Sequence, residues 1–165
     1  HLLDSGFVDG LAAYAAEVAR RFPWLRRFTP VNEPLTTARF AGAYGLWYPH
    51  RRDDASMVRA LLNQVHAVAA AMRAIRREIP GAELVQTDDL GRVSSTPRLA
   101  YQARFENERR WLAWALLAGR VDRHHPLWRY LLRHGATPGE LHALRDAPSP
   151  PDIIGINHYV TSDRW

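Results

Sequence analysis

The segment Thr29-Pro30-Val31-Asn32-Glu33-Pro34 combines a carboxylic acid and an amide with a following proline. Because a proline disfavours the right-handed helical conformation for the residue before it, we expect Glu33 to be extended at the end of a strand. A partly buried carboxylic acid in such a place can donate a proton near neutral pH, and the Asn32 amide can bind a hydroxyl as donor and acceptor. A salt-bridged or helix-capping glutamate beside a turn proline fits the same residues, and this segment alone leaves both interpretations open.

A second segment, Ile154-Gly155-Ile156-Asn157-His158-Tyr159, has the composition of a strand that ends in polar residues. Side chains alternate along a strand, so Asn157 and Tyr159 share one face while Ile156 and His158 share the other. The first pair would line a polar pocket at the strand's end. We interpret His158 as structural and expect it to point toward the surrounding helices.

The spacing of apolar residues predicts helices and strands in alternation. Parallel neighbours need long connections, so this order indicates an α/β fold with parallel strands and helical crossovers. Residues 38–54 mix glycines, aromatics and charges without a period and predict a long functional loop. The expected strands are 25–33, 83–88 and 152–159, and the expected helices are 7–22, one capped by Ser56 that ends at Pro80-Gly81, one from Thr96-Pro97 to Gly119, one from Pro126 to Gly135, and one opened by a capping box, Thr137-Pro138-Gly139-Glu140.

Composition excludes several classes of function. The chain has 165 residues and a formal charge of +5, and its 22 basic residues are all arginines that are dispersed along the chain, some in short pairs, which argues against a nucleic-acid surface. With no cysteine there is no disulfide framework, thiolate zinc site or cysteine nucleophile, and the solitary or adjacent histidines give no metal site. No dinucleotide-binding glycine motif occurs, so no cofactor is expected. The absence of a long apolar run or a signal peptide favours a cytoplasmic protein without a membrane partner.

Taken together, these segments resemble the family 1 glycoside hydrolases, the β-glucosidase family, over nearly the whole chain. Residues 29–34 are similar to that family's fourth-strand segment, Gly42 to Pro49 to its following loop, and 152–162 to its sixth strand. The resemblance implies a partial (β/α)8 TIM barrel, with residues 1–165 forming a single incomplete barrel segment of about the fourth to sixth strands.

The resemblance also implies roles for individual residues. Glu33 would be the general acid/base, and Asn32 would bind the hydroxyl beside the anomeric carbon of a saccharide or glycoside. Tyr159 would hydrogen-bond a catalytic nucleophile, and Asn157 would support the same pocket. In the loop after the strand that carries Glu33, Trp47 and Tyr48 are the best candidates for stacking against a sugar.

The family retains anomeric configuration, which requires a second carboxylate as nucleophile. In the family it lies on the seventh strand, beyond the part of the barrel that this chain resembles. We therefore expect a fragment of a retaining glycoside hydrolase acting on β-glycosidic bonds, inactive alone and completed by the remainder of the barrel from its parent protein.

The segment Gln86-Thr87-Asp88-Asp89-Leu90-Gly91 is more acidic than the family's usual fifth strand. Either aspartate could be a displaced functional carboxylate, although turn-forming aspartates before Leu-Gly are the ordinary interpretation. The acidic variant resembles a divergent subgroup joined to a sugar-nucleotide reductase domain. The alternative function is accordingly a non-catalytic carbohydrate-binding or scaffolding barrel domain of a larger protein.

Overall fold

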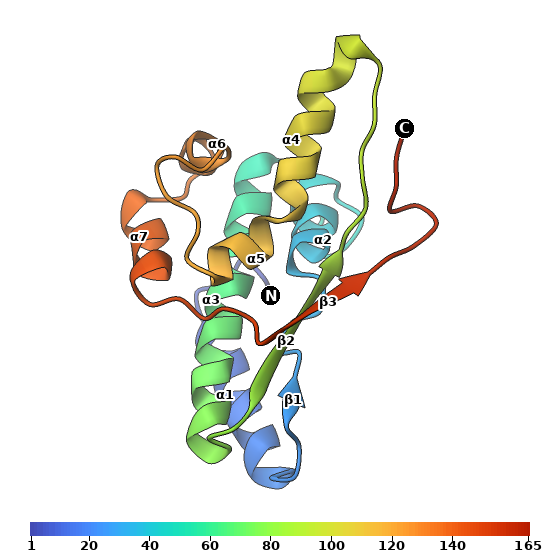
Figure 1. Ribbon diagram of the computed structural model, residues 1–165. Helices are drawn as coiled ribbons and strands as arrows, with labels where there is room; N and C mark the ends of the chain where they lie inside the picture. Colours follow the sequence, from blue (N-terminus) through green and yellow to red (C-terminus); the bar gives the residue numbers. More distant parts are fainter.

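Three parallel strands form one sheet in the order of the sequence, β1-β2-β3 (Figure 1). The computed structural model describes all residues from 1 to 165. Arg27 pairs with Glu83, and Val85 pairs with Ile153. The prediction of an α/β chain with parallel strands in this order is confirmed. The strands are β1 (Arg27–Phe28), β2 (Glu83–Asp89) and β3 (Ile153–Asn157).

Seven α-helices connect and cover these strands. Helices α1 and α3 lie side by side along the sheet, and α4 extends away from it (Figure 1). No helix is both long enough and apolar enough to cross a bilayer. The helices are α1 (Phe7–Arg21), α2 (Pro34–Ala38), α3 (Asp54–Glu78), α4 (Ala100–Arg110), α5 (Leu112–Leu117), α6 (Trp128–Arg133) and α7 (Pro138–Asp146), with a π-helical turn η1 (Arg39–Ala43) after α2 and a 3₁₀ turn η2 (Pro97–Leu99) before α4.

Helix α3 contributes more residues to the hydrophobic core than any other element. Fourteen of its 25 residues are buried, and the small side chains of Ala15 and Ala19 let α1 pack closely against it. The helix begins one turn earlier than expected, because the Asp53 carboxylate accepts a hydrogen bond from the Ser56 backbone N–H at 2.7 Å. Asp53, and not Ser56, is therefore the cap, and its charge also suits the positive end of the helix.

The segment before Glu33 differs most from the expectation. Only Arg27 and Phe28 pair with β2. Pro30 has no N–H to give to a ladder, and the chain bends away before Glu33. The predicted strand 25–33 is thus wrong outside Arg27 and Phe28. The first part of the predicted 38–54 loop is helical, because α2 continues into η1 up to Ala43.

At other helix boundaries, the structure can be compared with the caps expected from the sequence. The capping box is confirmed, since the Thr137 hydroxyl accepts from the Glu140 N–H and the Glu140 side chain accepts from the Thr137 N–H. Thr96 is the N-cap of η2 in an extended conformation and is followed by Pro97, as expected, although its side chain makes no capping hydrogen bond. Gly119 follows the end of α5 with a φ of +67°, which a residue without a Cβ adopts easily.

Replacing Gly42 in η1 by alanine is expected to destabilise the fold. A Cβ at this position would lie 2.6 Å from the backbone N and Cα of Met57 at the start of α3. Overpacking of this kind costs about 1–3 kcal/mol, measurable as a lower urea midpoint. Gly10→Ala is the matched control, because it lies within α1 with no atom within 4 Å of its added Cβ and should be neutral or stabilising. Equal effects of the two substitutions would contradict the close approach of η1 to α3.

Candidate active site

Side chains from all three strands meet where the strands end. Asn32 and Glu33 follow β1, Asn157 is the last residue of β3, and Tyr159 lies two residues further on. The Asn157 amide donates a hydrogen bond of 2.5 Å to Glu33 Oε1, and the Tyr159 hydroxyl donates one of 2.9 Å to the same oxygen. The alternation expected for this strand therefore brings Asn157 and Tyr159 to Glu33.

The Glu33 backbone is left-handed, with φ 48° and ψ 61°, and it forms the N-cap of α2. The expectation of an extended Glu33 is wrong. Pro34 only disfavours the right-handed helix, and a hydrogen bond of 3.2 Å from the Glu33 N–H to the Thr87 carbonyl of β2 fixes the chain in its place. A non-glycine residue with positive φ is strained, and such residues often occur at functional sites.

The Glu33 carboxyl group has one occupied and one free oxygen. Both side-chain donors bind Oε1, and Oε2 makes no hydrogen bond. The side chain is only 7% exposed. The two donors hold the carboxyl group in one orientation and leave Oε2 without a hydrogen-bond partner.

The Asn32 amide is oriented in the same way. Its Oδ1 accepts from the Thr87 hydroxyl at 2.8 Å and from the Asn157 amide at 3.2 Å. Because Oδ1 is the acceptor in both hydrogen bonds, Nδ2 is the atom that remains, and it has no partner. The group available for a ligand hydroxyl is therefore an N–H donor beside Glu33.

The partner of Tyr159 differs from the one that the family resemblance implies. Its hydroxyl donates to Glu33, not to a second carboxylate, because Glu33 is the carboxylate that the end of β3 reaches. This hydrogen bond to Glu33 raises the pKa of the Tyr159 phenol above its ordinary value, since ionising the phenol would remove the donor.

Asp88 and Asp89 belong to β2 and do not form a turn, so the turn interpretation is wrong. Each is buried and holds a neighbouring segment. Asp88 accepts from the Leu35 N–H at 2.9 Å and from the Thr36 hydroxyl at 3.2 Å, at the start of α2. Asp89 accepts from the Ser162 hydroxyl. Sequence reasoning missed these structural roles, because they depend on segments that are distant in the chain.

Burial raises the pKa of Asp88 to about 6, since desolvation of the charged form outweighs the hydrogen bonds that Asp88 accepts. These hydrogen bonds come from backbone N–H groups and from the Thr36 hydroxyl. The Asp88 side chain contacts the first residues of α2, the helix whose N-cap is Glu33. Asp88 therefore affects the site by fixing the position of α2.

The structure does not bring Trp47 and Tyr48 into the hydrogen-bonded cluster. Trp47 packs edge-on against Phe40 with a centroid distance of 4.9 Å, and Tyr48 packs against His1 at 5.3 Å. Both rings are exposed, and neither side chain makes a hydrogen bond to Glu33.

Trp114 and His158 have different surroundings. Trp114 is buried and donates its Nε1–H to the Gln86 carbonyl at 3.0 Å. His158 is exposed, and its Nδ1 lies 2.9 Å from the Leu90 carbonyl oxygen, so it contacts the chain after β2 instead of the helices.

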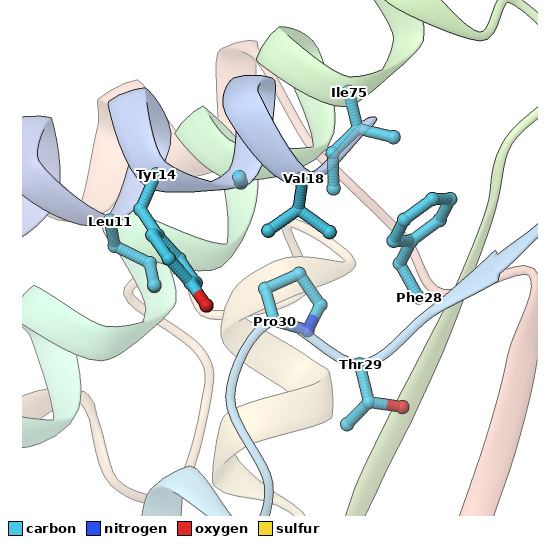
Figure 2. Close-up of a pocket in the computed structure, with 8 residues that line it drawn as sticks. Leu11, Tyr14, Val18, Phe28, Thr29, Pro30 and Ile75 are labelled. Carbon is cyan, nitrogen blue, oxygen red and sulfur yellow. The ribbon is translucent and has the colours of Figure 1, made fainter. Parts of the chain in front are cut away.

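The apolar cavity drawn in Figure 2 is separate from this cluster. It has a volume of about 170 Å³ and lies between α1 and the segment that contains β1 (Figure 2). Its walls hold no carboxylate, amide or cation, so it offers no group for proton transfer. Its lining residues are Leu11, Tyr14, Ala15, Val18, Phe28, Thr29, Pro30 and Ile75.

Comparison with known proteins gives a fold but no sequence relative. No family model and no curated protein matches the sequence. Among solved structures, a family 1 β-glucosidase from Thermotoga maritima in complex with isofagomine lactam superimposes with a TM-score of 0.81 at 18% identity, over 96% of this chain and 37% of that chain. The fold is that of part of a family 1 β-glucosidase.

Two further structures support this conclusion. The Thermotoga maritima β-glucosidase in complex with galacto-hydroximolactam gives a TM-score of 0.82 at 18% identity, over 96% of this chain and 36% of that chain. The AHE enzyme from Alicyclobacillus herbarius gives 0.77 at 20% identity, over 96% and 37%. The resemblance expected from the sequence is thus confirmed for the fold, and this chain spans about 37% of the length of the structures it matches.

Proposed function

We propose that residues 1–165 form the middle arc of a (β/α)8 barrel in a retaining glycoside hydrolase that acts on β-glycosidic bonds, with Glu33 as general acid/base. The observation that carries the proposal is the meeting of Asn32, Glu33, Asn157 and Tyr159 at the carboxyl ends of parallel strands. Catalytic side chains of (β/α)8 barrels lie at this end of the strands. The shared fold with β-glucosidases makes this chemistry the best supported one.

Glu33 would act twice in the reaction. Its free Oε2 would protonate the leaving oxygen and later take a proton from the incoming water. Asn157 and Tyr159 would keep the carboxyl group oriented through both steps. The free Nδ2–H of Asn32 would donate to the hydroxyl beside the anomeric carbon.

The nucleophile of the retaining reaction has to lie about 5 Å from the acid/base carboxyl group. Asp88 and Asp89 are the other carboxylates at the end of β2, and each already accepts hydrogen bonds from the segment that it holds. We therefore propose that the nucleophile comes from another strand of the full-length protein. These 165 residues alone would then not hydrolyse a glycoside.

Trp47 and Tyr48 are proposed as an outer platform for the ligand, distant from the reacting atoms. Exposed aromatic rings in a loop after the acid/base segment suit the apolar face of a sugar. The Thermotoga maritima β-glucosidase binds deoxynojirimycin and glucoimidazole. We propose that compounds of this kind also bind beside Glu33 in the full-length protein.

One observation favours the second candidate, a non-catalytic carbohydrate-binding or scaffolding domain. The Tyr159 hydroxyl donates to the carboxyl group that would do the chemistry. A carboxylate held in this way by Oε1 can accept hydrogen bonds from sugar hydroxyls at its free Oε2 without transferring a proton, which is all that a binding site requires.

A panel of 4-nitrophenyl β-glycosides, with the α-anomers as controls, tests the proposal on the full-length protein. Release of nitrophenol from β-anomers only would support the hydrolase. Saturable binding of the same sugars by calorimetry without turnover would favour the binding domain, and neither binding nor turnover would refute both.

A further inference from the structure

We infer that Asp89, Arg110 and Ser162 are positioning residues that hold the Tyr159 hydroxyl on Glu33. The inference rests on the proposed role of Glu33. Its basis is a chain of contacts that begins at the end of β2 and at the last residue of α4, passes through one buried serine, and ends at the Glu33 carboxyl group.

Ser162 is the centre of this chain and is only 1% exposed. Its hydroxyl donates to Asp89 Oδ1 and accepts a hydrogen bond of 2.8 Å from the Tyr159 N–H. Its carbonyl accepts from Arg110 Nη2 at 2.7 Å, and its N–H donates to the Tyr159 carbonyl at 2.9 Å. Residues 159–162 thus form a turn in which Tyr159 and Ser162 hydrogen-bond each other, and Ser162 connects this turn to the buried side chains of Asp89 and Arg110.

The two buried partners of Ser162, Asp89 and Arg110, form an ion pair. Arg110 Nη1 lies 3.8 Å from Asp89 Oδ2, and the two side chains are 3% and 10% exposed. Arg110 Nη1 has no hydrogen-bond partner, so this carboxylate is its nearest compensation. Breaking one member of a buried pair leaves the other charge uncompensated, which is strongly destabilising. The pair therefore gives Ser162 a single, fixed set of partners.

The backbone around Ser162 leaves no room for another placement. A Cβ on Gly91 would lie 2.4 Å from the carbonyl carbon and oxygen of Ser162, so the chain after β2 passes directly against it. A parallel bridge between Val93 and Arg164 continues this contact beyond both residues. Figure 1 shows the two extended segments running in the same direction beyond β2 and β3.

Tyr159 depends on this support because little else fixes it. Its side chain is 53% exposed and takes part in no aromatic pair, and its hydroxyl contacts Glu33. The place of its ring is set by the backbone at residue 159, whose N–H is held by Ser162. Loss of the Ser162 hydroxyl should then release the Tyr159 hydroxyl from Glu33 without altering any atom of Glu33.

The titration of Tyr159 tests this inference independently of catalysis. The full-length protein, labelled with ¹³C at tyrosine Cζ, is titrated by NMR, and Tyr159→Phe identifies the resonance. The expected result is that Ser162→Ala brings the Tyr159 pKa down toward its ordinary value of about 10. Asp89→Asn keeps an oxygen acceptor for the Ser162 hydroxyl and should lower the Tyr159 pKa by a smaller amount. Thr161→Ala is the control, because that side chain makes no hydrogen bond and should leave the titration unchanged.

A Tyr159 titration that is the same in Ser162→Ala and in the wild type would overturn the inference. If Ser162→Ala fails to fold, Ser162→Cys decides in the same way, because it keeps a small side chain with a weaker hydrogen-bonding group and leaves the Asp89–Arg110 pair intact. When the wild type hydrolyses glycosides, Ser162→Ala should also lower kcat by about 10- to 100-fold with little change in KM. When it does not, the proposed function fails, and the NMR result still decides whether these residues position Tyr159.

Discussion

Replacing Glu33 by glutamine is expected to lower kcat/KM of the full-length protein by about 10²- to 10⁴-fold for a β-glycoside with a poor leaving group. The amide fills the same space and can still contact Asn157 and Tyr159, but it cannot transfer a proton from Oε2 to the leaving oxygen. Steady-state hydrolysis of an alkyl β-glycoside measures the loss. Glu108→Gln is the matched control, because Glu108 is exposed on α4 and its side chain makes no hydrogen bond.

The size of this loss should depend on the leaving group. A 2,4-dinitrophenolate departs without being protonated, so the first chemical step of Glu33→Gln should stay close to the wild-type rate with that substrate. Pre-steady-state release of dinitrophenol measures this step. An equal loss with alkyl and dinitrophenyl glycosides would mean that Glu33 is not the acid.

At pH 4, replacing Asp88 by alanine is expected to lower the free energy of unfolding by about 3 kcal/mol or more. The change leaves buried donors at the start of α2, including the Leu35 N–H and the Thr36 hydroxyl, without their acceptor. Urea unfolding measures the loss. Asp146→Ala removes an exposed carboxylate that pairs with Arg145 and should cost no more than about 1 kcal/mol. Equal effects of the two substitutions would show that Asp88 does not hold α2.

The raised pKa of Asp88 predicts that the free energy of unfolding depends on pH. The folded pKa of Asp88, about 6, lies above its ordinary value of 3.8, so the folded state binds the proton more tightly. The contribution of Asp88 to the free energy of unfolding is therefore full below about pH 4 and falls by about 3 kcal/mol as the pH rises through 6.

Urea unfolding between pH 4 and pH 7 measures this dependence. Asp88→Asn does not titrate and should remove the decline, whatever its effect on stability at a single pH. An unchanged decline in Asp88→Asn would assign it to another group.

The order of helices and strands could be predicted because each depends on local patterns. The apolar period of α1 and α3 and the capping box at Thr137 need no information from the rest of the chain. The meeting of Asn157 and Tyr159 with Glu33 could also be anticipated, because strand alternation and parallel strand ends constrain it.

The details of the site could not be predicted, because they depend on contacts between distant segments. Pro34 removes one backbone conformation from Glu33, but the Thr87 carbonyl on another strand is what holds the left-handed one. Asp88 and Asp89 have the composition of a turn, yet pairing with β3 keeps both in β2. The partner of Ser162 likewise becomes visible only when β2 and the end of the chain lie side by side.

Azide rescue of the Glu33→Ala variant tests the role of Glu33 most directly. In a retaining hydrolase without its general base, the glycosyl-enzyme formed from a dinitrophenyl β-glycoside waits for a nucleophile that needs no deprotonation, and azide is one. We predict that azide accelerates turnover of Glu33→Ala in the full-length protein and gives a β-glycosyl azide, with no such product from the wild type. No acceleration, or an α-glycosyl azide, would contradict it.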